Sequence, residues 1–302
     1  MRTAQWSTLW RQGKRLFVWL LAVLVVLTTL SLVFLSTPYQ SPPDEVDTVA
    51  AEDDLTVDRT DFGYVLEPAG SSSHVGLVFY PGGRVSPDAY VKPLAPLARD
   101  ANVTVYIPDM PLNLAVVDYG MARLGVGTDA PDVAMASSPA IEEWYVGGHS
   151  LGGAMACRYA TVNADIDGLV LYASYCDRDV SDRDLAVLSV VGKADTVLDW
   201  EAYERGIRHL PPTAQVEVLE GVNHTQFASY TGQDAPSGTS YDTAHERLNR
   251  IAVPWFLNRT VSERLETSNH LADLKAAGSP TVRQPDAFNS FTLLPVAVSP
   301  VR

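Results

Sequence analysis

The chain has 302 residues, 46% of them hydrophobic, so it can bury one sizeable core. Four of its 22 cations precede residue 40 and no acid does, which leaves 18 cations and 36 acids in the rest, a net charge of −18. Nucleic acid and anionic lipid headgroups repel a domain with that charge, which excludes a nucleic-acid-binding role.

An apolar run near the N-terminus predicts a membrane anchor. Residues 16–35 carry no charge, and as a helix they span about 30 Å, the thickness of a bilayer core. A cleaved signal peptide is the alternative, but its first small-residue cleavage site, at residues 49–51, lies well past the run. We therefore expect an uncleaved single-pass transmembrane helix over residues 16–36.

The charges around this run predict its orientation. Arg11, Lys14 and Arg15 lie at its N-terminal end, so residues 1–15 are expected in the cytoplasm and the rest of the chain on the outer face. Residues 37–60 hold three prolines and an acidic run, which is typical of a solvated linker that holds a domain off the membrane.

Residues 61–258 alternate short apolar runs with helical patterns, which predicts an α/β domain with a mostly parallel sheet flanked by helices. The expected strands are residues 63–66, 75–80, 103–107, 144–147, 168–171, 185–191 and 215–219. The expected helices are residues 87–100, 151–163, 200–209 and 243–256, with one more between 111 and 139.

Prolines modify two of these helices, and a separate segment follows the domain. Pro93 and Pro96 are expected to kink or split the helix at 87–100, and Pro254 to disturb the end of the helix at 243–256. Residues 259–302 are expected to add an amphipathic helix at 262–276 and then a flexible, proline-containing tail.

Residues 148–152 read G-H-S-L-G, the G-x-S-x-G pattern of a nucleophile elbow, and they lie between an expected strand and an expected helix. A serine held clear of a strand end needs strained backbone angles, and side chains two residues either way would collide with the neighbouring strand and helix. Ser150 is therefore the candidate nucleophile.

A serine hydroxyl needs a base, usually a histidine oriented by a carboxylate. Asp195 follows the expected strand at 185–191, and His224 follows the one at 215–219, so both lie at the same sheet edge as Ser150. The order Ser, Asp, His is the order that this elbow uses in its fold. Four residues are alternatives: Asp177, Asp179 and Asp199 for the acid, and His245, expected at a solvated helical position, for the base.

Two backbone N–H groups are expected to stabilise the oxyanion that forms on the substrate. One is that of Leu151, directly after the nucleophile. The other is that of Gly83, in the Pro-Gly-Gly turn after the strand at 75–80, with Arg84 as the alternative donor. The Arg84 side chain is expected in solvent rather than on a substrate carboxylate.

No metal or cofactor is predicted. The histidines lack H-E-x-x-H or comparable spacing, and two cysteines are too few for a four-cysteine zinc site. Cys157 and Cys176 can either form a disulfide, which an oxidising outer face permits, or remain buried free thiols.

Residues 76–256 resemble the α/β-hydrolase superfamily, in particular its dienelactone-hydrolase-like and carboxylesterase-like members. The resemblance is carried by residues 80–83 (Y-P-G-G), 147–153 (G-G-H-S-L-G-G), 192–195 (G-K-A-D) and 223–227 (N-H-T-Q-F). It implies the α/β-hydrolase fold and a serine hydrolase mechanism without a cofactor. Dienelactone hydrolases carry a cysteine where Ser150 stands, so their substrate is not carried over.

Only about 13 residues separate the expected strands at 168–171 and 185–191, where many relatives insert a lid domain. An open site without a lid argues against an interfacially activated lipase. The sequence thus favours a membrane-anchored serine hydrolase that acts on a small-molecule ester or thioester. An acyltransferase with the same residues and a catalytically silent, membrane-tethered binding domain are the alternatives.

Overall fold

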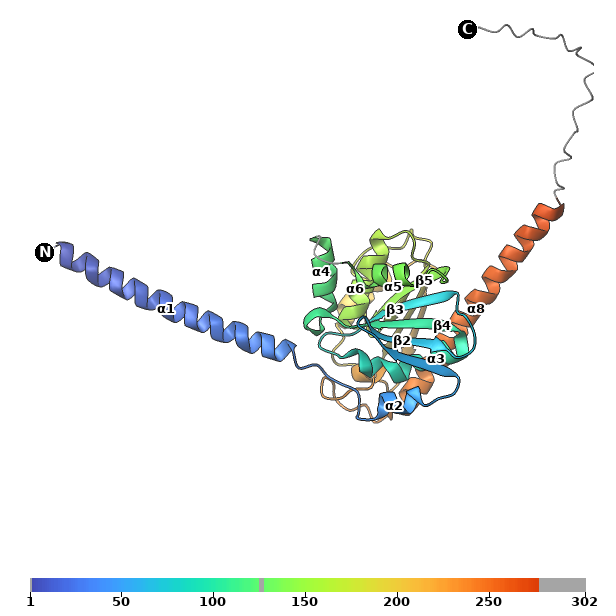
Figure 1. Ribbon diagram of the computed structural model, residues 1–302, viewed down its shortest axis with the longest axis horizontal. Coiled ribbons are helices and arrows are strands. Elements are labelled where there is room, and N and C mark those ends of the chain that lie inside the picture. Colours follow the sequence, from blue (N-terminus) through green and yellow to red (C-terminus); the bar gives the residue numbers. More distant parts are fainter. Residues whose placement is uncertain (1, 125–127, 277–302) are drawn as a thin grey trace, which may run out of the picture. The chain divides into compact units, whose positions relative to one another are not determined.

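The computed structural model describes residues 2–124 and 128–276 (Figure 1). Its centre is a sheet with the strand order β1-β2-β4-β3-β5-β6-β7-β8. The strands are β1 (Leu55–Arg59), β2 (Gly63–Pro68), β3 (Val75–Tyr80), β4 (Val103–Pro108), β5 (Glu143–His149), β6 (Gly168–Tyr172), β7 (Ala186–Gly192) and β8 (Gln215–Leu219).

The strands from β4 through β3 to β8 are parallel, while β1 and β2 are antiparallel additions beside β4. Parallel strands all end at one edge of a sheet, and the turns after β3, β5, β7 and β8 carry the residues singled out from the sequence. The mostly parallel α/β sheet predicted from the sequence is confirmed. The expected strands lie within two residues of the observed ones.

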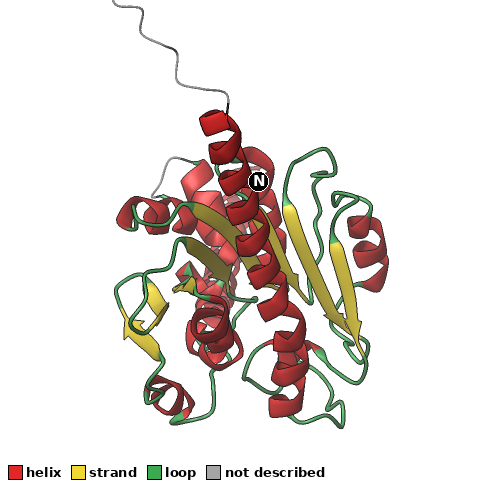
Figure 2. Cartoon of the chain, turned by 90° about the vertical axis from the view of Figure 1, so that its right-hand side faces the viewer, coloured by secondary structure: helices red, strands yellow, loops and turns green. Residues whose placement is uncertain are grey.

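Helices precede, connect and follow the strands of the sheet, and they are red in Figure 2. They are α1 (Arg2–Leu35), α2 (Glu45–Ala50), α3 (Val91–Ala101), α4 (Ala115–Arg123), α5 (Ala130–Ser137), α6 (Leu151–Val162), α7 (Trp200–Ile207) and α8 (Tyr241–Ala276). Three short 3-10 helices join them: η1 (Pro87–Tyr90), η2 (Pro111–Asn113) and η3 (His224–Phe227).

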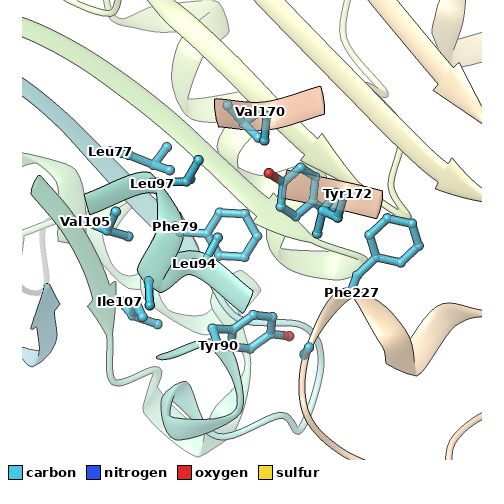
Figure 3. Packing of buried hydrophobic residues seen from close by; sticks show 14 of the residues in the cluster. Leu77, Phe79, Tyr90, Leu94, Leu97, Val105, Ile107, Val170, Tyr172 and Phe227 are labelled. Carbon is cyan, nitrogen blue, oxygen red and sulfur yellow. The ribbon is translucent and has the colours of Figure 1, made fainter. Parts of the chain in front are cut away.

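Because side chains alternate along the strands, the two faces of the sheet contribute to separate core clusters. In β3, Leu77 and Phe79 pack on one face with α3 and residues 244–256 of α8. Figure 3 shows part of this cluster, with Leu94 and Leu97 of α3 beside the strand residues. Val78 and Tyr80 point to the other face and pack with α5 and α6.

Proline acted on the helices differently from the expectation. The segment 87–100 does split, but at Tyr90, into η1 and α3, so that Pro93 falls in the first turn of α3, where no intrahelical N–H bond is lost. Pro254 does not end its helix. Two helices were expected here, but a single helix, α8, continues past Pro254 to Ala276. The region 111–139 holds η2, α4 and α5 rather than one helix.

Residues 37–60 are not the solvated linker that was expected. They contain α2 and the edge strand β1, whose Leu55 pairs with Pro68 of β2. Val49 and Leu55 are buried in the main core cluster, and Tyr39 bridges to Val85. The acids of this segment lie mostly on exposed or partly exposed positions, so a charged composition concealed an amphipathic pattern.

The N-terminal helix α1 includes a segment that is apolar and long enough to cross a membrane. Within residues 13–35, an 18-residue window has a mean hydropathy of 2.7, and none of that window is buried within the protein. The expected tail from residue 278 onward lies outside the described residues.

Candidate active site

Ser150 lies on a strained turn between β5 and α6. Its backbone angles are φ 53° and ψ −122°, a combination that residues other than glycine rarely adopt. The Ser150 N–H donates to the carbonyl oxygen of Tyr172 at 3.0 Å, and Ser174 Oγ donates to the Ser150 carbonyl oxygen at 2.6 Å. The end of β6 therefore holds the turn in place.

The glycines around Ser150 are required by close contacts. A Cβ on Gly148 would lie 2.5 Å from the carbonyl carbon of Gly152, and one on Gly153 would lie 2.6 Å from Ser174 Cβ. A Cβ on Gly152 would collide with the carbonyl oxygens of Tyr80 and Pro81 at the end of β3. The elbow thus packs backbone against backbone on both sides.

Asp195 and His224 form a buried pair after β7 and β8. His224 Nδ1 lies 2.7 Å from Asp195 Oδ2, and the two residues are only 1% and 3% exposed. Asp195 Oδ1 accepts bonds from the N–H groups of Val197 and Leu198, both at 2.8 Å. With Nδ1–H donated to the carboxylate, Nε2 can accept a proton, and it has no hydrogen-bonding partner among the described residues.

A second carboxylate, Asp234, joins the loops that carry this pair. Its side chain accepts bonds from the His224 N–H at 2.9 Å and from Thr196 Oγ1 at 2.5 Å, next to Asp195. Burial alone would raise the pKa of Asp234, but the hydrogen bonds from Thr196, His224 and Ala235 outweigh it and lower that pKa. No sequence pattern indicates Asp234, because it lies in a turn-rich segment without a motif.

His149, read from the sequence only as the variable position of the elbow motif, is completely buried and links three loops. The Gly82 N–H donates to Tyr90 Oη at 2.8 Å, Tyr90 Oη lies 2.9 Å from His149 Nδ1, and His149 Nε2 lies 3.1 Å from the His224 carbonyl oxygen. A carbonyl oxygen can only accept, so Nε2 carries the hydrogen of the neutral ring and Nδ1 accepts from the Tyr90 hydroxyl. Burial lowers the pKa of His149 well below its usual value and keeps the ring neutral.

The two candidate oxyanion donors lie next to each other. A Cβ built on Gly83 would lie 3.5 Å from Leu151 Cδ2 and 3.9 Å from Leu151 Cβ, both ordinary contact distances. The turn after β3 therefore lies beside the start of α6, as a two-donor oxyanion site requires. Gly82, the residue before Gly83, is packed more tightly, because a Cβ there would lie 2.8 Å from His149 Nδ1.

The Arg84 side chain was expected in solvent, but it is bound to the chain. Its Nε donates to the carbonyl oxygen of Phe34 at 2.9 Å, and its Nη2 donates to that of Thr37 at 2.8 Å. The guanidinium also lies 3.5 Å from the centre of the Phe34 ring. Arg84 thus binds the C-terminal end of α1.

The alternative acids and base each have another structural partner. Asp199 caps α7 by accepting from the Ala202 N–H at 2.9 Å. Asp177 pairs with Arg158 and Asp179 with Ser181, both at 2.6 Å. His245 is 5% exposed, so its expected solvated position was wrong, and its Nε2 bonds to the Ala228 carbonyl oxygen at 3.1 Å.

Cys157 of α6 and Cys176, which follows β6, form a disulfide with their Cα atoms 5.4 Å apart. This resolves the choice that the sequence left open, and the bond ties α6, the helix that follows Ser150, to the segment after β6. Over the described residues, no group of three or more His, Cys, Asp or Glu side chains is arranged to hold a metal ion.

A family model described as the alpha/beta hydrolase family matches residues 76–246. The match covers more than half of the chain and contains the turns after β3, β5, β7 and β8. The chain belongs to the alpha/beta hydrolase family, and its membership suggests hydrolase activity. A comparison with curated proteins found no match.

Proposed function

We propose that the protein is a serine hydrolase of the carboxylesterase type that cleaves an ester or thioester. The observation that carries the proposal is the buried Asp195–His224 pair, whose Nε2 makes no hydrogen bond among the described residues, Ser150 Oγ included, and can therefore take up a proton. The ring centres of His149 and His224 lie 4.5 Å apart, so the proposed base contacts the residue that precedes the proposed nucleophile.

In the first half of the reaction, His224 Nε2 takes the Ser150 hydroxyl proton while Oγ attacks the carbonyl carbon. The N–H groups of Leu151 and Gly83 stabilise the negative oxygen of the tetrahedral intermediate. The intermediate collapses when the bond to the leaving alcohol or thiol breaks, and the proton on Nε2 passes to that leaving group. Ser150 then carries the acyl group.

In the second half, Nε2 removes a proton from water, whose oxygen attacks the acyl carbon. The second intermediate releases the carboxylic acid and returns the proton to Ser150 Oγ. Asp195 fixes the tautomer of His224 throughout and stabilises its charged form, because its carboxylate stays on Nδ1. Every group in this cycle belongs to the protein or the substrate.

We place α1 across a membrane, with residues 1–15 in the cytoplasm and the catalytic domain on the outer face. The length and hydropathy of residues 13–35 support this placement, and so do the cations at the N-terminal end of the run. A membrane-impermeant, amine-reactive reagent should modify the domain on intact cells. Modification only after lysis would contradict the orientation.

A fluorophosphonate probe tests the proposed nucleophile. Wild-type protein should become labelled and should hydrolyse p-nitrophenyl butyrate, Ser150→Ala should do neither, and His224→Ala should lose on the order of a thousandfold in rate. His74→Ala is the control, because His74 is exposed just before the N-terminal end of β3, whereas the elbow turn lies beside the C-terminal end of that strand. An unlabelled wild-type protein would favour a binding domain without catalysis, and transfer of the acyl group to an added alcohol would favour an acyltransferase.

A further inference from the structure

The proposed oxyanion turn is joined directly to the end of the apolar helix. Arg84, the residue after Gly83, binds the carbonyl oxygens of Phe34 and Thr37. From the other side, Asn113 Nδ2 donates to the Leu35 carbonyl oxygen at 2.8 Å. Cations near a helix C-terminus satisfy its free carbonyls and interact favourably with its dipole, so these contacts fix the helix end on the domain.

Arg84 and Asn113, which both bind the end of α1, are also bonded to each other. The Arg84 N–H donates to the Asn113 carbonyl oxygen at 2.7 Å, so the turn after β3 and η2 form one unit beneath the end of α1. Leu35 is the last residue of the apolar segment, where a spanning helix leaves the hydrocarbon. Gly83 is one residue, about 3.8 Å between Cα atoms, from the arginine that holds this end.

An exposed apolar surface continues from this junction along η2 and α4. Leu112, Val116 and Met121, three large apolar residues within ten positions of the chain, are 41%, 39% and 39% exposed. We call these three residues the η2–α4 surface. It reaches the proposed site through Leu114, whose Cδ2 would lie 3.8 Å from a Cβ on Gly83.

The charge of this segment differs from that of the domain. Residues 111–124 contain one acid and one cation, whereas the chain after residue 40 has a net charge of −18. The acid, Asp118, turns inward, because its Oδ2 accepts from the Ala130 N–H at 3.2 Å, and burial raises its pKa. The η2–α4 surface is thus an apolar and nearly uncharged area on an acidic domain.

We propose that the η2–α4 surface rests in the interfacial layer of the same membrane that α1 spans, and that the ester enters the site from this layer. The inference rests on the proposed function and names its substrate class: an amphiphilic ester whose acyl chain lies in the bilayer and whose ester bond lies at headgroup level. An apolar, weakly charged face beside a spanning helix is suited to that depth. No lid has to open, because the site lies permanently at the surface that holds its substrate.

The test uses the full chain in phosphatidylcholine vesicles and two ester probes. One is p-nitrophenyl butyrate, which stays in water, and the other is 4-methylumbelliferyl oleate, which partitions into the bilayer. The double variant Leu112→Asp, Val116→Asp should lower hydrolysis of the oleate at least tenfold and change hydrolysis of the butyrate less than twofold. The matched control is Val162→Asp, at the opposite end of α6 from Ser150 and 54% exposed, which should change neither.

A second measurement reports the membrane contact without activity. A fluorophore on Leu112→Cys or Val116→Cys should be quenched by brominated phosphatidylcholine, and one on Val162→Cys should not. Absence of quenching at both η2–α4 positions would overturn the proposed membrane contact. Quenching together with equal effects on both esters would overturn substrate entry from the membrane. Quenching with no hydrolysis of either ester by wild-type protein would instead refute the proposed function and leave the membrane contact standing.

Discussion

His149 Nε2 donates a hydrogen bond to the backbone carbonyl oxygen of His224, so the residue before the elbow serine holds the loop of the proposed base. The other ring nitrogen accepts from Tyr90, which in turn binds the Gly82 N–H beside the proposed oxyanion donor. One buried, neutral ring therefore connects the loops of the proposed nucleophile, the proposed base and the proposed oxyanion turn. We assign His149 a positioning role.

Replacing His149 should affect the chemical step more than substrate binding. His149→Phe keeps an aromatic ring but leaves Tyr90 and the His224 carbonyl without their bonds, so kcat should fall about ten- to hundredfold through misplacement of the reacting groups. KM for p-nitrophenyl butyrate should change little. His149→Gln, whose amide can accept from Tyr90 and donate to the carbonyl, should recover part of the loss. Equal kcat in all three proteins would contradict the assignment.

Gly152→Ala should disrupt the elbow. The added methyl group would collide with the backbone carbonyl oxygen of Tyr80, so either the turn of Ser150 or the end of β3 must move. We expect a loss of about 3 kcal/mol or more in the free energy of unfolding, together with loss of probe labelling. Gly120→Ala, within α4 and with no group outside its own stretch of helix within 4 Å of the added Cβ, should stabilise the protein by up to about 1 kcal/mol. Denaturant unfolding measures both changes, and similar effects of the two substitutions would show that the elbow is not tightly packed.

Reduction of the Cys157–Cys176 bond should destabilise the domain. The two residues are 19 apart in sequence, and closing a loop of that size contributes about 3 kcal/mol, chiefly by restricting the unfolded chain. Reductant should therefore lower the melting temperature of wild-type protein by about 10 °C. The double variant Cys157→Ser, Cys176→Ser should already melt at the lower temperature and should not respond to reductant. A wild-type melting temperature that is insensitive to reductant would mean that the bond adds no stability.

The contribution of Asp234 to stability should disappear in acid. Its pKa is lower in the folded than in the unfolded chain, so folding favours the carboxylate. The stabilisation is complete above the unfolded pKa, about 3.9, and is lost as the pH falls through the lower folded value. The difference in unfolding free energy between wild type and Asp234→Asn should thus be constant from pH 5 to 7 and should shrink below about pH 4. A difference that persists unchanged at pH 3 would show that Asp234 contributes to stability through its packing and not through its charge.

Regular hydrophobic patterns predicted the fold well. Buried parallel strands such as β3 and β7 read as short apolar runs between turns, and those runs predict their bounds to within one residue. The edge strand β1 was missed, because Asp58 and Arg59 point outward and the preceding acids gave the segment the composition of a linker.

The candidate site divides in the same way. Ser150, Asp195 and His224 could be predicted because each follows a strand and belongs to a motif whose chemistry requires it. His149, Asp234 and Arg84 act through long-range contacts, with partners 75, 38 and 50 residues away, and no local pattern encodes such pairs. The disulfide belongs to this second group, because sequence spacing does not determine the distance between two cysteines.

The integration of residues 39–59 into the domain has a consequence for shedding. A protease that releases an ectodomain usually cuts an unstructured stalk, but here only Ser36, Thr37 and Pro38 separate α1 from the bridge at Tyr39. Arg84 occupies the Thr37 carbonyl oxygen and so restricts access to that junction. With α1 across a membrane, as we propose, we expect the domain to resist proteolytic release, so that a secreted form would have to be produced without α1.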